Sequence, residues 1–109
     1  MTESEFLTVA GAVLDDIESR LEQAADSAGV DLECSRSGNV LEIEFDDGAK
    51  IVVNRHVPNQ ELWIAAKSGG FHFALRDGQW LAARDGAEFG ATLSQVVSTA
   101  AGEAFRFVV

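Results

Sequence analysis

The sequence predicts an α+β fold, a two-layer sandwich in which two helices cover one face of an antiparallel sheet of about six strands. Apolar residues recur every three to four positions near both ends of the chain, and at every second position in between. Short turn sequences separate the alternating segments, as in a meander of neighbouring antiparallel strands. Two amphipathic helices can cover only one face of such a sheet, so the other face should be exposed to water.

The first predicted element is a helix over residues 3–25, with Ser4 as its expected N-cap and Gly29 as the residue that ends it. Its apolar positions form one stripe: Phe6, Ala10, Val13, Ile17, Leu21 and Ala24. Four acidic residues, which we call the acidic ridge, fall on the opposite face: Asp15, Glu18, Glu22 and Asp26. No basic residue lies on the same line of the helix, so the ridge is expected to carry unpaired negative charge.

The middle of the chain alternates with a period of two and predicts short strands. These cover roughly residues 30–35, 41–45, 51–53, 62–67, 71–76 and 80–82. The expected turns are Asp47–Gly48, Gly69–Gly70 and Asp77–Gly78. By parity, the exposed face of the sheet should carry Asp31, Glu33, Glu42, Glu44, Lys50, Val52, Asn54, Trp63, Lys67, His72 and Arg76.

The last predicted element is a second helix over residues 88–101. Its shared apolar face consists of Phe89, Leu93, Val96, Val97 and Ala100. Asp85 or Gly86 is expected to open this helix, and Gly102 to close it.

Length and composition indicate one domain spanning residues 1–109. The chain is 47% hydrophobic and contains one proline, as in a folded protein with a single core. No apolar run approaches the roughly 20 residues of a membrane span, and no secretory signal is visible. One cysteine can form neither an internal disulfide nor a zinc-finger ligand set. We therefore expect a reduced, cytoplasmic protein.

Charge is distributed unevenly along the chain. The formal net charge is −10, and residues 1–47 hold thirteen acidic and two basic residues. Such a chain repels phosphate backbones and anionic bilayers, so neither a nucleic-acid nor a membrane partner is expected.

Residues 54–65, NRHVPNQELWIA, and residues 69–73, GGFHF, form a combined motif. This motif resembles that of the bacterial branch of the frataxin family. The family signature, an Asn-x-Gln-x-Pro stretch leading into a tryptophan-bearing strand, is similar to residues 54–65, NRHVPNQELWIA. The Gly-Gly-x-His-Phe motif of the family is similar to residues 69–73, GGFHF. Further matching segments are residues 4–6, 41–45, 47–54, 86–89 and 101–103, so the resemblance covers nearly the whole chain. His56 and Glu61 depart from the pattern, since each stands where the family has glutamine.

The resemblance implies a frataxin-like fold and iron binding along the acidic ridge. It also implies docking on the cysteine desulfurase and scaffold machinery of iron–sulfur cluster assembly, with modulation of the desulfurase rate. The candidate metal residues are Glu18, Glu22, Asp26, Asp31 and Glu33, supported by Asp15, Asp16 and Glu3. Carboxylate oxygens suit hard cations, but without histidine or thiolate ligands we expect weak, exchangeable binding of Fe²⁺ or Fe³⁺, or of other divalent cations. The alternative is that the ridge is simply a solvated face.

The same acids are candidates for partner binding, because unbalanced negative charge attracts a basic surface in a salt-dependent way. The candidate partner-binding residues are Trp63, Asn54, Glu18, Glu22, Asp31 and Glu33. An exposed tryptophan is typical of an interface anchor, although Trp63 could merely cover its neighbours. Trp80 is expected to pack in the core. His56 and His72 are expected to be ordinary surface histidines, and Cys34 an inert buried thiol.

No nucleophile elbow, P-loop or dinucleotide motif is present, so we expect a monomeric adaptor and not an enzyme. Three alternatives stay open. The first is a ferroxidase, which would need a closed di-iron ligand set. The second is an iron-storage protein that forms oligomers when loaded with iron. The third is an acidic interaction module with no metal role.

Overall fold

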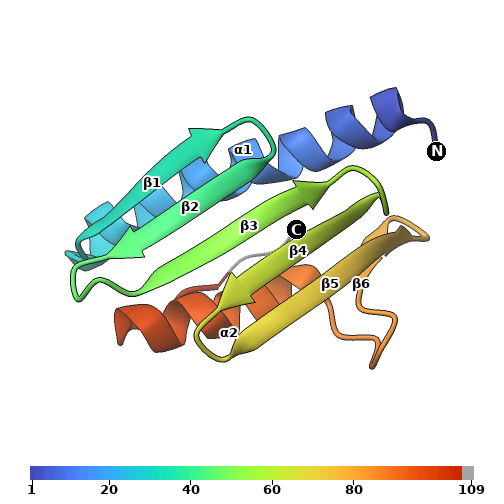
Figure 1. Cartoon of the computed structure of the whole chain (residues 1–109). Helices are drawn as coiled ribbons and strands as arrows, with labels where there is room; N and C mark the ends of the chain where they lie inside the picture. The colour runs from blue at the N-terminus through green and yellow to red at the C-terminus, as the bar shows by residue number, and fades with distance from the viewer. Residues whose placement is uncertain (107–109) are drawn as a thin grey trace.

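The computed structural model describes residues 1–106 and contains the predicted two layers (Figure 1). A single six-stranded antiparallel sheet has its strands in chain order, and both helices lie on one of its faces. The elements are α1 (Glu3–Ala28), β1 (Leu32–Ser37), β2 (Val40–Phe45), β3 (Lys50–His56), β4 (Glu61–Ala66), β5 (Gly69–Arg76), β6 (Gln79–Leu81) and α2 (Phe89–Ala101). The predicted α+β sandwich is confirmed. None of the described helices is both long and apolar enough to cross a bilayer.

Helix α1 begins two residues earlier than its predicted cap would place it. The N-cap is Thr2, not Ser4, because Thr2 forms a reciprocal capping box with Glu5. The hydrogen bonds from Thr2 lower the pKa of the Glu5 carboxyl. Gly29 ends the helix in the left-handed conformation, as predicted.

The buried stripe of α1 is rotated slightly from the predicted one. Leu14 and Ala25 are buried, whereas Val13 and Ala24 are half-buried. The core continues through the inner face of the sheet and reaches Trp80, which is 4% exposed and packs edge-on against Phe6. The predicted packing role of Trp80 is confirmed.

Of two predicted turns in the meander, the structure confirms one and contradicts the other. Asp77 and Gly78 have φ values of 51° and 81° and form the predicted two-residue turn between β5 and β6. The predicted Gly69–Gly70 turn is wrong. Lys67 and Ser68 make that turn, and Gly69 lies already in β5 with a φ of 143° that other residues rarely adopt. At α2, Glu88 is the N-cap in place of Asp85 or Gly86, and Gly102 ends the helix as predicted.

Arg55 fixes α1 on the sheet. Its Nη1 donates a hydrogen bond to the Leu7 carbonyl oxygen at 2.9 Å, and its Nε donates to the Asn39 side chain at 2.9 Å. Gly11 makes this approach possible, because a Cβ at that position would lie 2.8 Å from the Arg55 Nη1. The guanidinium therefore joins the helix layer to strand β3 at one defined position.

Candidate functional site

The acidic ridge lies along the side of α1 that borders strand β1. Cys34 on β1 is close enough to the ridge to be affected by its charges. Burial raises the pKa of the Cys34 thiol, and the negative charges of Glu22 and Glu18 raise it further, to about 11, because they disfavour the thiolate. Glu18 is half-buried, whereas Glu22 and Asp26 are exposed. The predicted core position of Cys34 is confirmed in part, since its side chain is half-buried.

Basic residues neutralise one end of the ridge, contrary to the prediction that it carries no paired charge. Arg36 projects from β1 and forms an ion pair with Asp15. Arg20, one turn along the helix, pairs with Asp16 at 2.9 Å. No ion pair engages Glu18, Glu22 or Asp26 in the described part of the chain. The unpaired charge of the ridge therefore lies on Glu18, Glu22 and Asp26, three of its four carboxylates.

The remaining candidate acids lie away from the ridge. Glu33 faces Glu44 across the β1–β2 pair, on the sheet face that the helices leave uncovered. Asp31 borders a shallow hollow of about 180 Å³ together with Asp46 and Asp47. Glu3 lies in the first turn of α1, fifteen residues before Glu18 and hence about 22 Å away along the helix.

The arrangement provides carboxylates singly or in pairs. Within residues 1–106, no three Asp, Glu, His or Cys side chains lie close enough together to hold one metal ion. Oxygen ligands still suit iron as a hard cation, but such a site would leave most coordination positions to water. Asp46 and Asp47, which we had not predicted as site residues, add charge near Asp31 because the β2–β3 connection returns there.

Trp63 occupies the centre of the uncovered sheet face and is enclosed between two histidines. The His56 ring stacks on Trp63 with centroids 3.7 Å apart, and His72 stacks on the other side at 4.0 Å. The sheet register explains this, because Trp63 lies directly opposite His72 on β5 and two residue pairs from His56 on β3, on the same face. We call these three residues the Trp63 stack. The expectation that His56 and His72 are ordinary surface histidines did not foresee this stacking.

Polar neighbours complete the Trp63 stack. The Trp63 Nε1 donates to Glu61 Oε1 at 2.8 Å, and Asn54 lies directly opposite Trp63 on β3, as parity predicted. The Nδ1 atom of His56 is buried and has no hydrogen-bond partner among the described residues. Glu61 and His56, the two departures from the frataxin signature, thus both contact Trp63.

Comparisons with known proteins agree with this geometry. A family model described as a frataxin-like domain matches residues 1–103. The iron–sulfur cluster assembly protein CyaY of Janthinobacterium sp. (strain Marseille) is 61% identical over 94% of this chain and 92% of its own length. The protein of that name from Neisseria meningitidis serogroup B is 55% identical over 95% of this chain and 94% of its own.

Solved structures show the same fold. Frataxin from Psychromonas ingrahamii superposes with a TM-score of 0.81 and 28% identity, over the whole of both chains. Trimeric frataxin from Saccharomyces cerevisiae, complexed with ferrous iron, superposes with a TM-score of 0.74 and 26% identity, over 86% of each chain. The meander, the two helices on one face and the signature around Trp63 all agree with these matches, and the chain belongs to the frataxin family, in its CyaY-like bacterial branch.

Proposed function

We propose that this protein is an iron-binding adaptor of iron–sulfur cluster assembly, which docks on the cysteine desulfurase complex and modulates its rate. The observation that carries the proposal is the pairing of two unlike surfaces on one small domain: the unpaired acids of the ridge and the Trp63 stack. The names of its bacterial relatives, iron–sulfur cluster assembly proteins, support the process. The yeast frataxin complexed with ferrous iron supports the metal.

In this proposal iron is cargo and signal, not a catalytic centre. Single carboxylates or pairs among Glu18, Glu22 and Asp26 would hold Fe²⁺ with micromolar or weaker affinity, about 8 kcal/mol or less, since water keeps most of the coordination positions. A bound cation would cancel part of the negative field that attracts a basic partner. Iron occupancy would therefore change the affinity for the desulfurase, which is a simple form of iron sensing in the cytoplasm.

The test is a binding titration of this protein against its own cysteine desulfurase, at low and moderate salt, with and without Fe²⁺. We expect binding that weakens with salt and changes with iron. The variant E18Q/E22Q/D26N should lose most of both dependences, whereas D77N/E103Q, which removes two charges elsewhere, should retain them. Absence of binding under every condition would contradict the adaptor function and leave only the family assignment.

Iron-loaded oligomers are a second candidate, and the trimeric yeast frataxin is the observation that favours it. Sedimentation velocity with increasing Fe²⁺ tests this candidate directly. Oxygen consumption measured per iron separates catalytic oxidation from slow surface oxidation. A monomer at every iron ratio would favour the adaptor alone.

A further inference from the structure

Strand β5 presents a free backbone edge over residues 69–73. On one side it pairs with β4 along six residues, from Gly69 to Ala74. On the other side β6 pairs only with Ala74, Leu75 and Arg76. The part of β5 before Ala74 therefore lacks a neighbouring strand, and an uncovered strand edge of this kind is a template for pairing with another chain.

The register indicates which backbone groups face outward. The Lys67–Ser68 turn has two residues, so the flanking pair Ala66–Gly69 exchanges hydrogen bonds and successive pairs alternate from there. The N–H and C=O groups of Gly70 and His72 consequently point away from β4. No hydrogen bond within residues 1–106 engages them from the other side. Gly69 and Gly70 also carry no side chain that would shield the edge.

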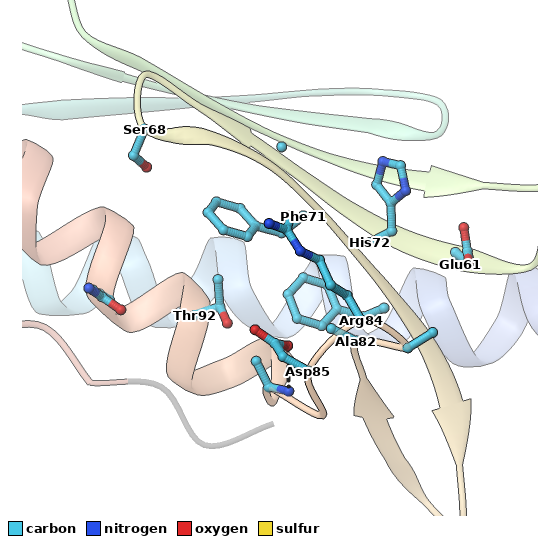
Figure 2. Close-up of a pocket in the computed structure, with 13 residues that line it drawn as sticks. Glu61, Ser68, Phe71, His72, Ala82, Arg84, Asp85 and Thr92 are labelled. Carbon is cyan, nitrogen blue, oxygen red and sulfur yellow. Dashed lines mark hydrogen bonds between the residues drawn. The ribbon is translucent and has the colours of Figure 1, made fainter.

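A hollow of about 630 Å³ adjoins this edge (Figure 2). Phe71 and Phe73 form one wall, and Ala82 and Ala87 from the β6–α2 connection form another. Figure 2 shows the Arg84 side chain extending from that connection into the hollow, toward Phe71. The hollow thus combines an apolar lining, a cation and an adjacent row of free backbone groups, which suits an extended peptide with an apolar side chain.

Three cations without ion-pair partners in the described part of the chain lie around the edge. Lys67 lies in the turn before it, Arg76 at the far end of β5, and Arg84 in the hollow; none forms an ion pair with the described residues. Arg20, Arg36 and Lys50, by contrast, are all ion-paired. The carboxylates that line the hollow accept internal hydrogen bonds, Glu61 from Trp63 Nε1 and Asp85 from the Ala87 N–H. These two carboxylates keep their negative charges because their donors are neutral, so the three cations exceed them by one, in a protein whose net charge is −10.

We propose that the free edge of β5 is a docking site for an extended, acidic segment of a partner protein. The segment adds as a strand beside Gly70 and His72, places an apolar side chain in the hollow, and directs carboxylates toward Lys67 and Arg84. Main-chain hydrogen bonds supply affinity, and the cations select an acidic sequence over a basic one. This site depends on neither iron nor the acidic ridge, so it can fail while the proposed adaptor function stands.

The test uses two capped hexapeptides, one alternating aspartate with valine and the other lysine with valine, titrated into the ¹⁵N-labelled protein. We expect the aspartate peptide to shift the amide resonances of Gly70 and His72 saturably and to slow their hydrogen exchange. The lysine peptide should do neither. Equal effects of the two peptides, no saturable shift at millimolar peptide, or shifts confined to α1 would each overturn the proposal.

Two variants locate the binding on the edge. R84E should weaken the aspartate peptide about threefold to tenfold, whereas R106E, the same charge change at a residue outside the hollow, should leave it unchanged. G70P removes one outward N–H at an edge position where proline is tolerated, and should abolish binding. If G70P does not fold, the comparison of peptide affinity between R84E and R106E tests the proposal. Unaltered binding to R84E would contradict the assigned site.

Discussion

The acidic ridge and the Trp63 stack lie on opposite sides of the sheet and are built in opposite ways. The ridge is a set of four carboxylates on α1, most of them exposed, and three of them form no ion pair with the described residues. In the stack, Trp63 and His56 are half-buried and His72 is exposed, and the rings are held at centroid distances of 3.7 and 4.0 Å with one hydrogen bond. The attraction between charges extends over a Debye length of about 8 Å, so it persists when the partner surface is displaced by a few ångströms. Ring stacking requires direct contact and is lost on such a displacement. The molecule thus separates long-range attraction from short-range recognition.

The largest effect should come from removing the centre of the stack. W63A should weaken binding to the cysteine desulfurase complex by about 2–4 kcal/mol, because buried aromatic anchors dominate interfaces. Its fold should persist, since Trp63 lies outside the core cluster. Isothermal titration calorimetry measures the affinity, and V52A on the same sheet face is the matched truncation, expected to bind as the wild type does. A W63A affinity equal to that of V52A would remove the distinction between the two surfaces.

A smaller effect should follow when α1 loses its attachment to the sheet. R55M eliminates the hydrogen bonds to Leu7 and Asn39 and should lower the free energy of unfolding by about 1–3 kcal/mol. Because charge acts at long range, the salt dependence of partner binding should survive this change. Urea denaturation measures the stability. Loss of the salt dependence in a folded R55M protein would mean that the ridge also needs a fixed position.

Neutralising the ridge should have a weaker effect than W63A. We expect E18Q/E22Q/D26N to lower partner affinity about threefold to tenfold at low salt and hardly at all at high salt. The free energy of unfolding should stay the same or rise slightly, since like-charge repulsion is relieved. Binding measured at several salt concentrations, with D77N/E103Q as control, gives the answer. An equal loss at high and low salt would assign these residues to direct contact.

The smallest effect concerns the thiol beside the ridge. Burial first, and Glu22 and Glu18 second, raise the pKa of Cys34 to about 11, so little thiolate exists near neutral pH and reaction with a disulfide reagent should be slow. Removing the two negative charges in E18Q/E22Q makes the thiolate less unfavourable, so the pKa should fall while staying above its ordinary value. The rate of reaction followed from pH 7 to 11 measures this. An unchanged profile would mean that the ridge carboxylates exert no field at β1.

The sequence could predict what depends on local pattern. Period-two alternation placed Trp63 and Asn54 on the uncovered face, and helical spacing placed Glu18 and Glu22 together. The sequence could not predict contacts that depend on how helices and strands are placed relative to one another. The pairing of Arg36 with Asp15 requires the position of β1 beside α1, and the stacking of His56 on Trp63 requires the strand register. The Thr2 cap was available in the sequence, since Thr2 and Glu5 match a capping box.

The strands lie in the sheet in the same order as in the chain, and this order affects how the protein folds. Three of the five strand connections contain two residues and the other two contain four, so closing each pairing costs little chain entropy. Each strand after β1 also finds the preceding strand already synthesised when it leaves the ribosome. Among the described residues, most contacts of high sequence separation come from the packing of the helices, with Arg55 and the Gln60–Met1 hydrogen bond in addition, which favours fast folding for a sheet protein. Docking of the two helices, and not strand pairing, should therefore limit the folding rate.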